Sequence, residues 1–217
     1  MLRDCVFDNG GALDLVNVER CVFTNYTDAV VFERGSRISN SLITGCTRPY
    51  IYGHWGSEEF VNCSFIGNKL GDNLVTVSAE GAGLGVRFTN CLFAENTSFF
   101  TGESLDVSVA DGQTAGVVFD HCAYKTANAS AQGLLNVGTN FKVDAAIGWR
   151  FNKGKFANFP YWMPRQGSPV VDKGLLLDWT EADIDLGGNL RVRNGAVDIG
   201  CYENAGEPVF GSTFMLR

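Results

Sequence analysis

The stretch Phe60-Val61-Asn62-Cys63-Ser64-Phe65 decides the fold, because its pattern recurs along the first two thirds of the chain. The pattern is an apolar residue, any residue, a turn residue, cysteine, any residue and an aromatic residue. Five further copies lie at residues 2–7, 18–23, 38–43, 88–93 and 119–124, and the copy at 38–43 has serine for cysteine and isoleucine for the aromatic. Six copies of one short unit predict a repeat architecture.

The third position of the unit predicts a sharp bend in the chain. It is occupied by Asp4, Arg20, Asn40, Asn62, Asn90 and His121. Asn, Asp and His are the residues other than glycine that best tolerate the left-handed backbone conformation. The cysteine and the aromatic that follow point to one face of the next strand, because side chains alternate along a strand. Each unit therefore contributes a bend and two inward residues.

The cysteine-type position occurs at residues 5, 21, 41, 63, 91 and 122, with spacings of 16, 20, 22, 28 and 31. These spacings suit a β-solenoid whose insertions enter loops. A further apolar run follows each unit along the chain, at residues 12–15, 29–32, 50–52, 74–77, 105–109 and, less clearly, 134–137. We therefore expect three short strands per coil, stacked in parallel ladders. A β-sandwich is the structural alternative, although it would not need the same bend and cysteine in every unit.

The repeat resembles the right-handed parallel β-helix proteins of the pectin-lyase-like superfamily. Asn40, Asn62 and Asn90 match the asparagine ladder at the tight bend of that fold. The resemblance implies an all-β, single-stranded right-handed parallel β-helix of about six coils over residues 1–140. It implies little about activity, because that fold serves lyases, hydrolases, adhesins and phage tailspikes.

Residues 141–217 are expected to form an irregular C-terminal capping segment. They contain the runs SPVVDKG (168–174), DLGGNLR (185–191) and VDIGCYE (197–203). These runs resemble the C-terminal block of bacterial secreted β-helix proteins of the choice-of-anchor type. The resemblance implies an exported protein, either extracellular or on the cell surface. We expect Trp149, Trp162 and Trp179 to cover the open end of the last coil, which would otherwise expose a ladder edge.

Charged side chains of this segment are expected to fix its turns, because pairs of arginine with carboxylates are directional. They are Asp172, Asp185, Arg191, Asp198 and Glu203. The functional alternative is a calcium site made by Asp183, Asp185 and Asp198, since Ca²⁺ requires several oxygen ligands. Their spacing fits no dedicated calcium loop, so we expect no cofactor and no metal, with Ca²⁺ as the alternative.

The bulk composition limits the partners of the chain. The net charge of -7 and the lack of a basic run argue against a nucleic-acid partner. The sequence contains no run of 18 apolar residues, so we expect no membrane span. Residues 1–4 are not followed by an apolar run, so we expect no signal sequence in this chain and expect it to begin inside its first repeat. We therefore expect a fragment without its N-terminal cap, which would pair with upstream β-helix coils or self-associate through that end. Five of the seven cysteines share one repeat position, which favours buried free thiols over disulfides or a metal site.

In this family, polysaccharides bind in a groove over the first strand of each coil. The residues that we expect to line such a groove are Asp14, Glu33, Tyr50, Tyr52, His54, Trp55 and Asp106. No residue is assigned a catalytic role, because the acid–base clusters of lyases and glycosidases are missing. We expect a non-catalytic glycan-binding or adhesive, structural module. The alternative is a fragment of a polysaccharide lyase or glycoside hydrolase with Asp14 and Glu33 as its carboxylate pair.

Overall fold

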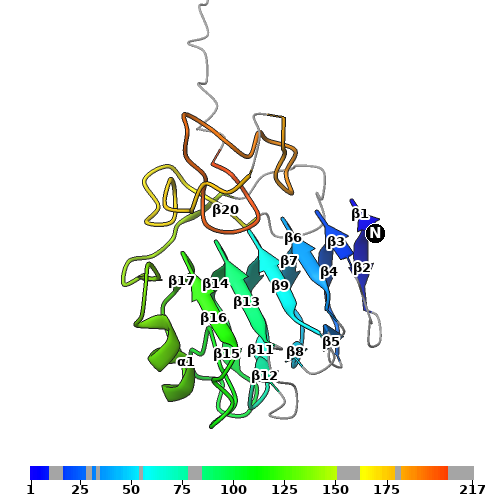
Figure 1. Ribbon diagram of the computed structural model, residues 1–217, viewed down its shortest axis with the longest axis vertical. Helices are drawn as coiled ribbons and strands as arrows, with labels where there is room; N and C mark the ends of the chain where they lie inside the picture. The colour runs from blue at the N-terminus through cyan, green and yellow to red at the C-terminus, as the bar shows by residue number, and fades with distance from the viewer. Residues whose placement is uncertain are drawn as a thin grey trace, which may run out of the picture.

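The chain folds into stacked parallel β-strands, as the repeat predicts (Figure 1). The computed structural model describes residues 1–9, 17–27, 31–32, 35–53, 56–77, 85–150, 162–178 and 182–204. Three parallel sheets run along the stack, and successive strands of one sheet come from successive coils. This arrangement confirms the all-β, parallel β-helix class.

We call the sheets 1, 2 and 3. Sheet 1 contains β1 (Leu2–Arg3), β3 (Asn17–Glu19), β6 (Arg37–Ser39), β9 (Glu58–Val61), β13 (Val86–Thr89) and β16 (Val117–Asp120). Sheet 2 contains β2 (Val6–Asp8), β4 (Val22–Thr24), β7 (Leu42–Thr44), β10 (Ser64–Ile66), β14 (Leu92–Ala94), β17 (Ala123–Tyr124) and β18 (Phe141–Lys142). Sheet 3 contains β5 (Val31–Phe32), β8 (Tyr50–Gly53) and β12 (Val75–Val77). Smaller pairs are the parallel β11 (Lys69–Leu70) with β15 (Thr97–Ser98) and the antiparallel β19 (Trp149–Arg150) with β20 (Met163–Pro164).

The bend between sheets 1 and 2 has the predicted left-handed conformation in all six coils. The φ angles there lie between 47° and 56° for Asp4, Arg20, Asn40, Asn62, Asn90 and His121. We call this row the asparagine bend. Each of its residues ends a sheet 1 strand and starts the turn into sheet 2, so the bend sets the register of both sheets.

The repeat cysteines point into the interior and form no disulfide; all seven cysteines are free thiols. Cys63 Sγ donates to the carbonyl oxygens of Val61 and Ile38, both at 3.4 Å. Ser41 holds the same place in the 38–43 copy, and its hydroxyl donates to the Ser39 carbonyl at 2.7 Å. A small side chain with one donor is therefore what this position requires, which explains why serine can replace cysteine.

The inward aromatics stack along the axis of the helix. The ring centroids of Phe60 and Phe88 are 5.1 Å apart, and those of Phe88 and Phe119 are 4.9 Å apart. Phe65 and Phe93 stack in the same way at 5.1 Å. These offset stacks add to the burial of apolar area, which holds the coils together.

The prediction of two further sheet 3 strands, at residues 105–109 and 134–137, is wrong. Residues 105–109 form only isolated bridges, Val75 with Val109 and Val107 with Ala127. Residues 134–137 fall at the end of a helix, α1 (Ala129–Leu135), because Asn128 caps its N-terminus by accepting from the backbone N–H of Ala131. The helix lies beside the last coil (Figure 1), where its buried Ala131 and Leu135 join the interior core. At seven residues, this single helix among the described residues is too short to cross a membrane.

The segment after residue 142 covers the outer face of sheet 2, whereas we expected it to cover the end of the last coil. The sheet 2 strands β4, β7, β10 and β14 are buried on both faces, and their outward apolar residues need a partner. The second apolar core contains outward Leu42, Ile66 and Leu92 together with Met163 and Ile199 from the segment. Trp149 and Trp162 pack edge to face at 5.2 Å against this core; Trp179 lies outside the described residues.

Candidate functional site

The structure describes three of the seven predicted ligand-binding residues, which are Tyr50, Tyr52 and Asp106. The other four lie outside the described residues, so their roles stay predictions; they are Asp14, Glu33, His54 and Trp55. The three described residues do not form one site. Tyr50 and Tyr52 lie on sheet 3, whereas Asp106 is buried in a different part of the coil.

Tyr50 and Tyr52 form a stacked pair on the outward face of β8. Ile51 between them points inward and is fully buried, so the alternation of the strand places both tyrosines on the other face. Their rings are 5.9 Å apart and inclined by 26°, and both residues are half-buried. Thr76 of β12 pairs in register with Tyr52 and is also half-buried. The outward face of sheet 3 thus presents two aromatic rings beside a hydroxyl group.

Arg48 lies two residues before Tyr50 in the chain and carries a positive charge. Its guanidinium carbon is 5.6 Å from the ring centroid of Phe99, which is a cation–π distance. The stem of Arg48 passes over Gly71, since a Cβ at Gly71 would lie 3.4 to 3.6 Å from the Arg48 side-chain carbons. The Arg48 side chain therefore passes within van der Waals distance of this position on its way to the ring.

The loop after β15 displays two phenyl rings to solvent. Phe99 is 45% and Phe100 is 62% exposed, and their rings meet edge to face at 5.2 Å. Ser98 holds the loop, because its Oγ accepts from the backbone N–H groups of Phe100 and Thr101 at 3.3 and 3.2 Å. The backbone of Ser98 also bonds to Gly102 and Glu103. The two rings are thus held in place before any ligand arrives.

We define the aromatic surface as Arg48, Tyr50, Tyr52, Phe99 and Phe100. Sequence reasoning found the two tyrosines and missed the other three residues. A signal was available for the phenylalanines, because Phe99 and Phe100 are consecutive aromatics within the loop that the sequence predicts at residues 95–103. No such signal existed for Arg48, whose contact with Phe99 crosses from one coil to another and depends on the stacking of the coils.

Asp106 does not point outward, so that prediction is wrong. It is 2% exposed, and its carboxylate accepts from the backbone N–H groups of Asn96, Lys125 and Thr126 at 3.0 to 3.2 Å. Burial raises its pKa, and these hydrogen bonds oppose the rise. A carboxylate with this many donors is held in place as a structural acceptor.

Asp106 also ends a second buried ladder that sequence reasoning missed. Asn68 Oδ1 accepts from the backbone N–H of Cys46, and Asn96 Oδ1 accepts from the backbone N–H of Asn68 at 2.8 Å. Asp106 Oδ1 then accepts from Asn96. The available signal was spacing, because Asn68 and Asn96 each follow a repeat cysteine by five residues. This ladder fixes the bend that follows sheet 2.

The charged residues of the C-terminal segment surround Arg191, which is fully buried. Its Nη1 lies 3.2 Å from Glu203 Oε1, and its Nη2 donates to the Gly200 carbonyl at 2.6 Å. Asp185 accepts from the backbone N–H of Glu203 at 2.7 Å. Asp198 accepts from the N–H of Asp172, which contributes its backbone and not its side chain. The five residues therefore lie in one network that fixes the turns.

The carboxyl groups of Asp185, Asp198 and Glu203 are engaged with hydrogen-bond donors. Burial raises the pKa of Asp185 and of Asp198, and it raises the pKa of Glu203 to about 8 against the attraction of Arg191. In the described part of the chain, no group of three or more His, Cys, Asp or Glu side chains is placed to hold a metal ion. The structure thus gives these residues an internal structural role.

The sequence matches no protein-family model and no curated protein. The fold class therefore rests on the repeat and on the parallel sheets.

Proposed function

We propose that the chain is a non-catalytic glycan-binding module that contacts sugar through the aromatic surface. The observation that carries this proposal is the stack of half-buried Tyr50 and Tyr52 on the outward face of β8. Aromatic faces pack against the apolar C–H faces of sugar rings, while the phenol groups exchange hydrogen bonds with sugar hydroxyls. Two such rings in a row suit a chain of sugar units better than a single small molecule.

Arg48 and the phenylalanine loop support the same assignment. Arg48, two residues before Tyr50 in the chain, carries a planar guanidinium group, and its contact with Phe99 limits its motion. Phe99 and Phe100 extend the apolar area on a loop that hydrogen bonds already order. Because little ordering is required on binding, the entropic cost of complex formation is small.

We further propose that the protein is exported and acts outside the cell or on its surface, as the resemblance of the C-terminal runs implies. Free thiols in such a place need protection from oxidation. Burial supplies this protection, because it raises the pKa of Cys21 and of Cys46 to about 11. The reactive thiolate form is therefore suppressed. Surface labelling of intact producing cells, followed by detection of the chain, tests this location.

The described residues offer little support for the enzymatic alternative, a polysaccharide lyase or glycoside hydrolase. It rests on a carboxylate pair of Asp14 and Glu33, which lie outside the described residues. Asp106, the third acidic candidate, is occupied by backbone donors. No described observation therefore favours a lyase or hydrolase over a binding module.

A glycan array with the purified chain, followed by calorimetric titration of any hit, tests the binding function. Tyr50→Ala and Tyr52→Ala should each weaken binding about tenfold, because each removes one stacking ring. The matched control is Leu190→Ala, which removes a side chain that is 52% exposed and remote from β8. The absence of any glycan hit, or unchanged affinity in the double tyrosine variant, would overturn the proposal.

A further inference from the structure

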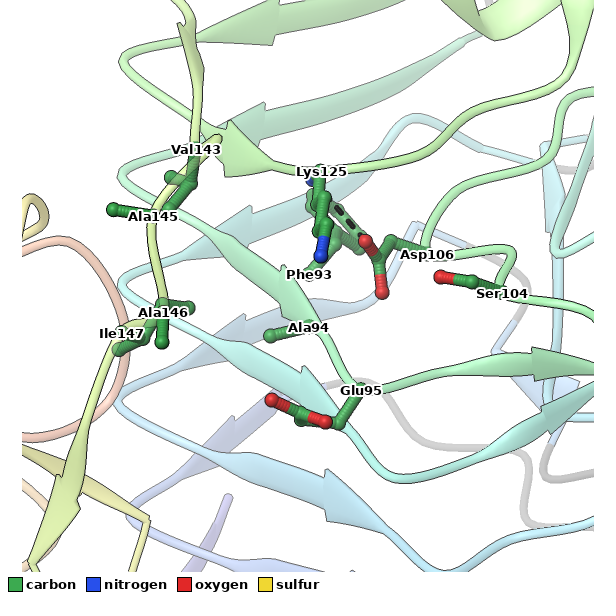
Figure 2. Close-up of a pocket in the computed structure, with 10 residues that line it drawn as sticks. All are labelled: Phe93, Ala94, Glu95, Ser104, Asp106, Lys125, Val143, Ala145, Ala146 and Ile147. Atoms are coloured by element: carbon green, nitrogen blue, oxygen red, sulfur yellow. Dashed lines mark hydrogen bonds between the residues drawn. The ribbon is translucent and has the colours of Figure 1, made fainter.

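A separate pocket of about 170 Å³ lies between the end of sheet 2 and the segment that follows β18 (Figure 2). Val143, Ala145, Ala146 and Ile147 form one wall, and the other residues that line it are Phe93, Ala94, Glu95, Ser104, Asp106 and Lys125. None of these residues belongs to the aromatic surface. A closed cavity of about 150 Å³ accommodates benzene, so this space suits a ligand of similar size.

Glu95 and Lys125 place opposite charges at this pocket. They follow neighbouring strands, because Leu92 of β14 pairs with Ala123 of β17. Neighbouring strands of a sheet are about 4.8 Å apart, so both side chains can reach the two ends of one small molecule. Figure 2 draws the two side chains apart, with no interaction between them. Both residues are exposed, so neither charge requires a partner within the protein.

The backbone of Glu95 has a left-handed conformation that glutamate rarely adopts. Its φ angle is +56°, and the residues at the same place in the preceding coils are Asn9, Asn25, Gly45 and Gly67, which are types that tolerate a positive φ. Glycine adopts this conformation without steric cost, whereas glutamate does not. Trp149 Nε1 donates to Glu95 Oε1 at 3.5 Å, which restricts the position of the carboxylate. Glutamate at this place thus costs backbone energy that glycine or asparagine would not.

The other polar groups that line the pocket already have hydrogen-bond partners, so Glu95 and Lys125 are the groups that would recognise a ligand. Asp106 is saturated, because its two oxygens accept from three backbone N–H groups and from the hydroxyl of Thr126. The Ser104 hydroxyl already shares a hydrogen bond with Thr126 Oγ1 at 3.2 Å. A ligand in this pocket thus meets one carboxylate, one ammonium group and a wall of small apolar side chains.

We propose that this pocket binds a small zwitterion, namely a free aliphatic α-amino acid. Its ammonium group pairs with Glu95, its carboxylate pairs with Lys125, and its side chain packs against Val143, Ala146 and Ile147. The limited volume favours short aliphatic side chains over aromatic ones. This site is independent of the glycan-binding function, because the two sets of residues do not overlap.

Titration of the ¹⁵N-labelled chain with L-valine, followed by NMR, tests the proposal. We expect shift changes confined to residues 93–95, 104–106, 125 and 143–147, with saturation at millimolar concentration. Isobutylamine and isovalerate carry only one of the two charges, so each should bind at least about tenfold more weakly than L-valine. D-glucose should leave these resonances unchanged.

The variants Glu95→Gln and Lys125→Met should each weaken L-valine binding about tenfold or more, because each removes a charge-assisted hydrogen bond. Their matched controls are Glu103→Gln and Lys142→Met, which change exposed charges that do not line the pocket. Glu95→Gly provides a variant whose backbone is relaxed, so a loss of binding there cannot be assigned to misfolding. Equal binding of isovalerate and L-valine, a response to glucose alone, or unchanged affinity in the two pocket variants would overturn the proposal.

Discussion

The guanidinium group of Arg191 contacts the side chain of Asn62 across the boundary between the C-terminal segment and the β-helix. With the amide oriented so that its oxygen meets donors, Asn62 Oδ1 accepts from Nε and Nη2 of Arg191, both at 2.5 Å. The repeat that opens the sequence and the signature runs that close it therefore meet at one contact. The C-terminal segment is anchored to the asparagine bend along the side of the helix.

Loss of Arg191 should destabilise the protein strongly. The change Arg191→Met removes a buried charge and leaves Glu203 without its partner, which costs about 3–5 kcal/mol for a buried pair. Urea unfolding at a pH above 8, where Glu203 is ionised, measures this loss. The control is Arg37→Met, which breaks an exposed ion pair with Glu59 and should cost less than about 1 kcal/mol. Equal losses in the two variants would show that the contact does not anchor the segment.

Stability should fall as the pH rises from about 4.5 to about 8. Burial raises the folded-state pKa of Glu203 from 4.5 to about 8, so the folded state holds a proton that the unfolded state has released. The contribution of this group is fully present below pH 4.5 and is lost as the pH passes through 8. Asp185 and Asp198, whose pKa values are also raised by burial, add to the trend in the same direction. Chemical denaturation across this range measures the slope.

The variant Glu203→Gln isolates the contribution of that one group. It cannot titrate, so its stability should change less with pH than that of the parent chain. A slope identical to that of the parent would assign the pH dependence to other groups.

Asn90 should tolerate glycine better than alanine. Its φ of 53° favours glycine, and its amide bonds to the N–H and carbonyl of Leu175 at 2.7 and 2.8 Å. Asn90→Gly loses only these two bonds, whereas Asn90→Ala adds the cost of a left-handed alanine, about 1 kcal/mol. Thermal unfolding of both variants measures the difference. Alanine equal to or better than glycine would mean that the bend does not constrain the backbone.

The thiols should be almost inert in the folded protein. Six of the seven cysteines are buried and Cys5 is only partly exposed, and burial raises the pKa of Cys21 to about 11. A thiol reagent at neutral pH should modify Cys5 first and the rest only after denaturant is added. Rapid reaction of several thiols without denaturant would show that the coils open locally.

The repeat unit predicts most of the helix because its information is local. The left-handed bend at Asn62, the inward Cys63 and the outward Tyr50 follow from backbone preference and from the alternation of side chains along a strand. These rules act over a few residues and are the same in every coil. Asp106 departs from them, because its region forms bridges in place of a strand and its side chain turns inward to meet backbone donors.

The sequence by itself determined the class of fold, the asparagine bend, the thiol-lined interior and the two tyrosines that face outward. Only the tertiary structure decided that the C-terminal segment lies on sheet 2, that α1 packs beside the last coil, and that Arg48 meets Phe99. Contacts of this kind join residues far apart in the chain, such as Cys201 N–H with Ser64 Oγ at 2.9 Å. They depend on which surfaces remain apolar or unsatisfied after the coils have stacked, and no local pattern encodes that outcome.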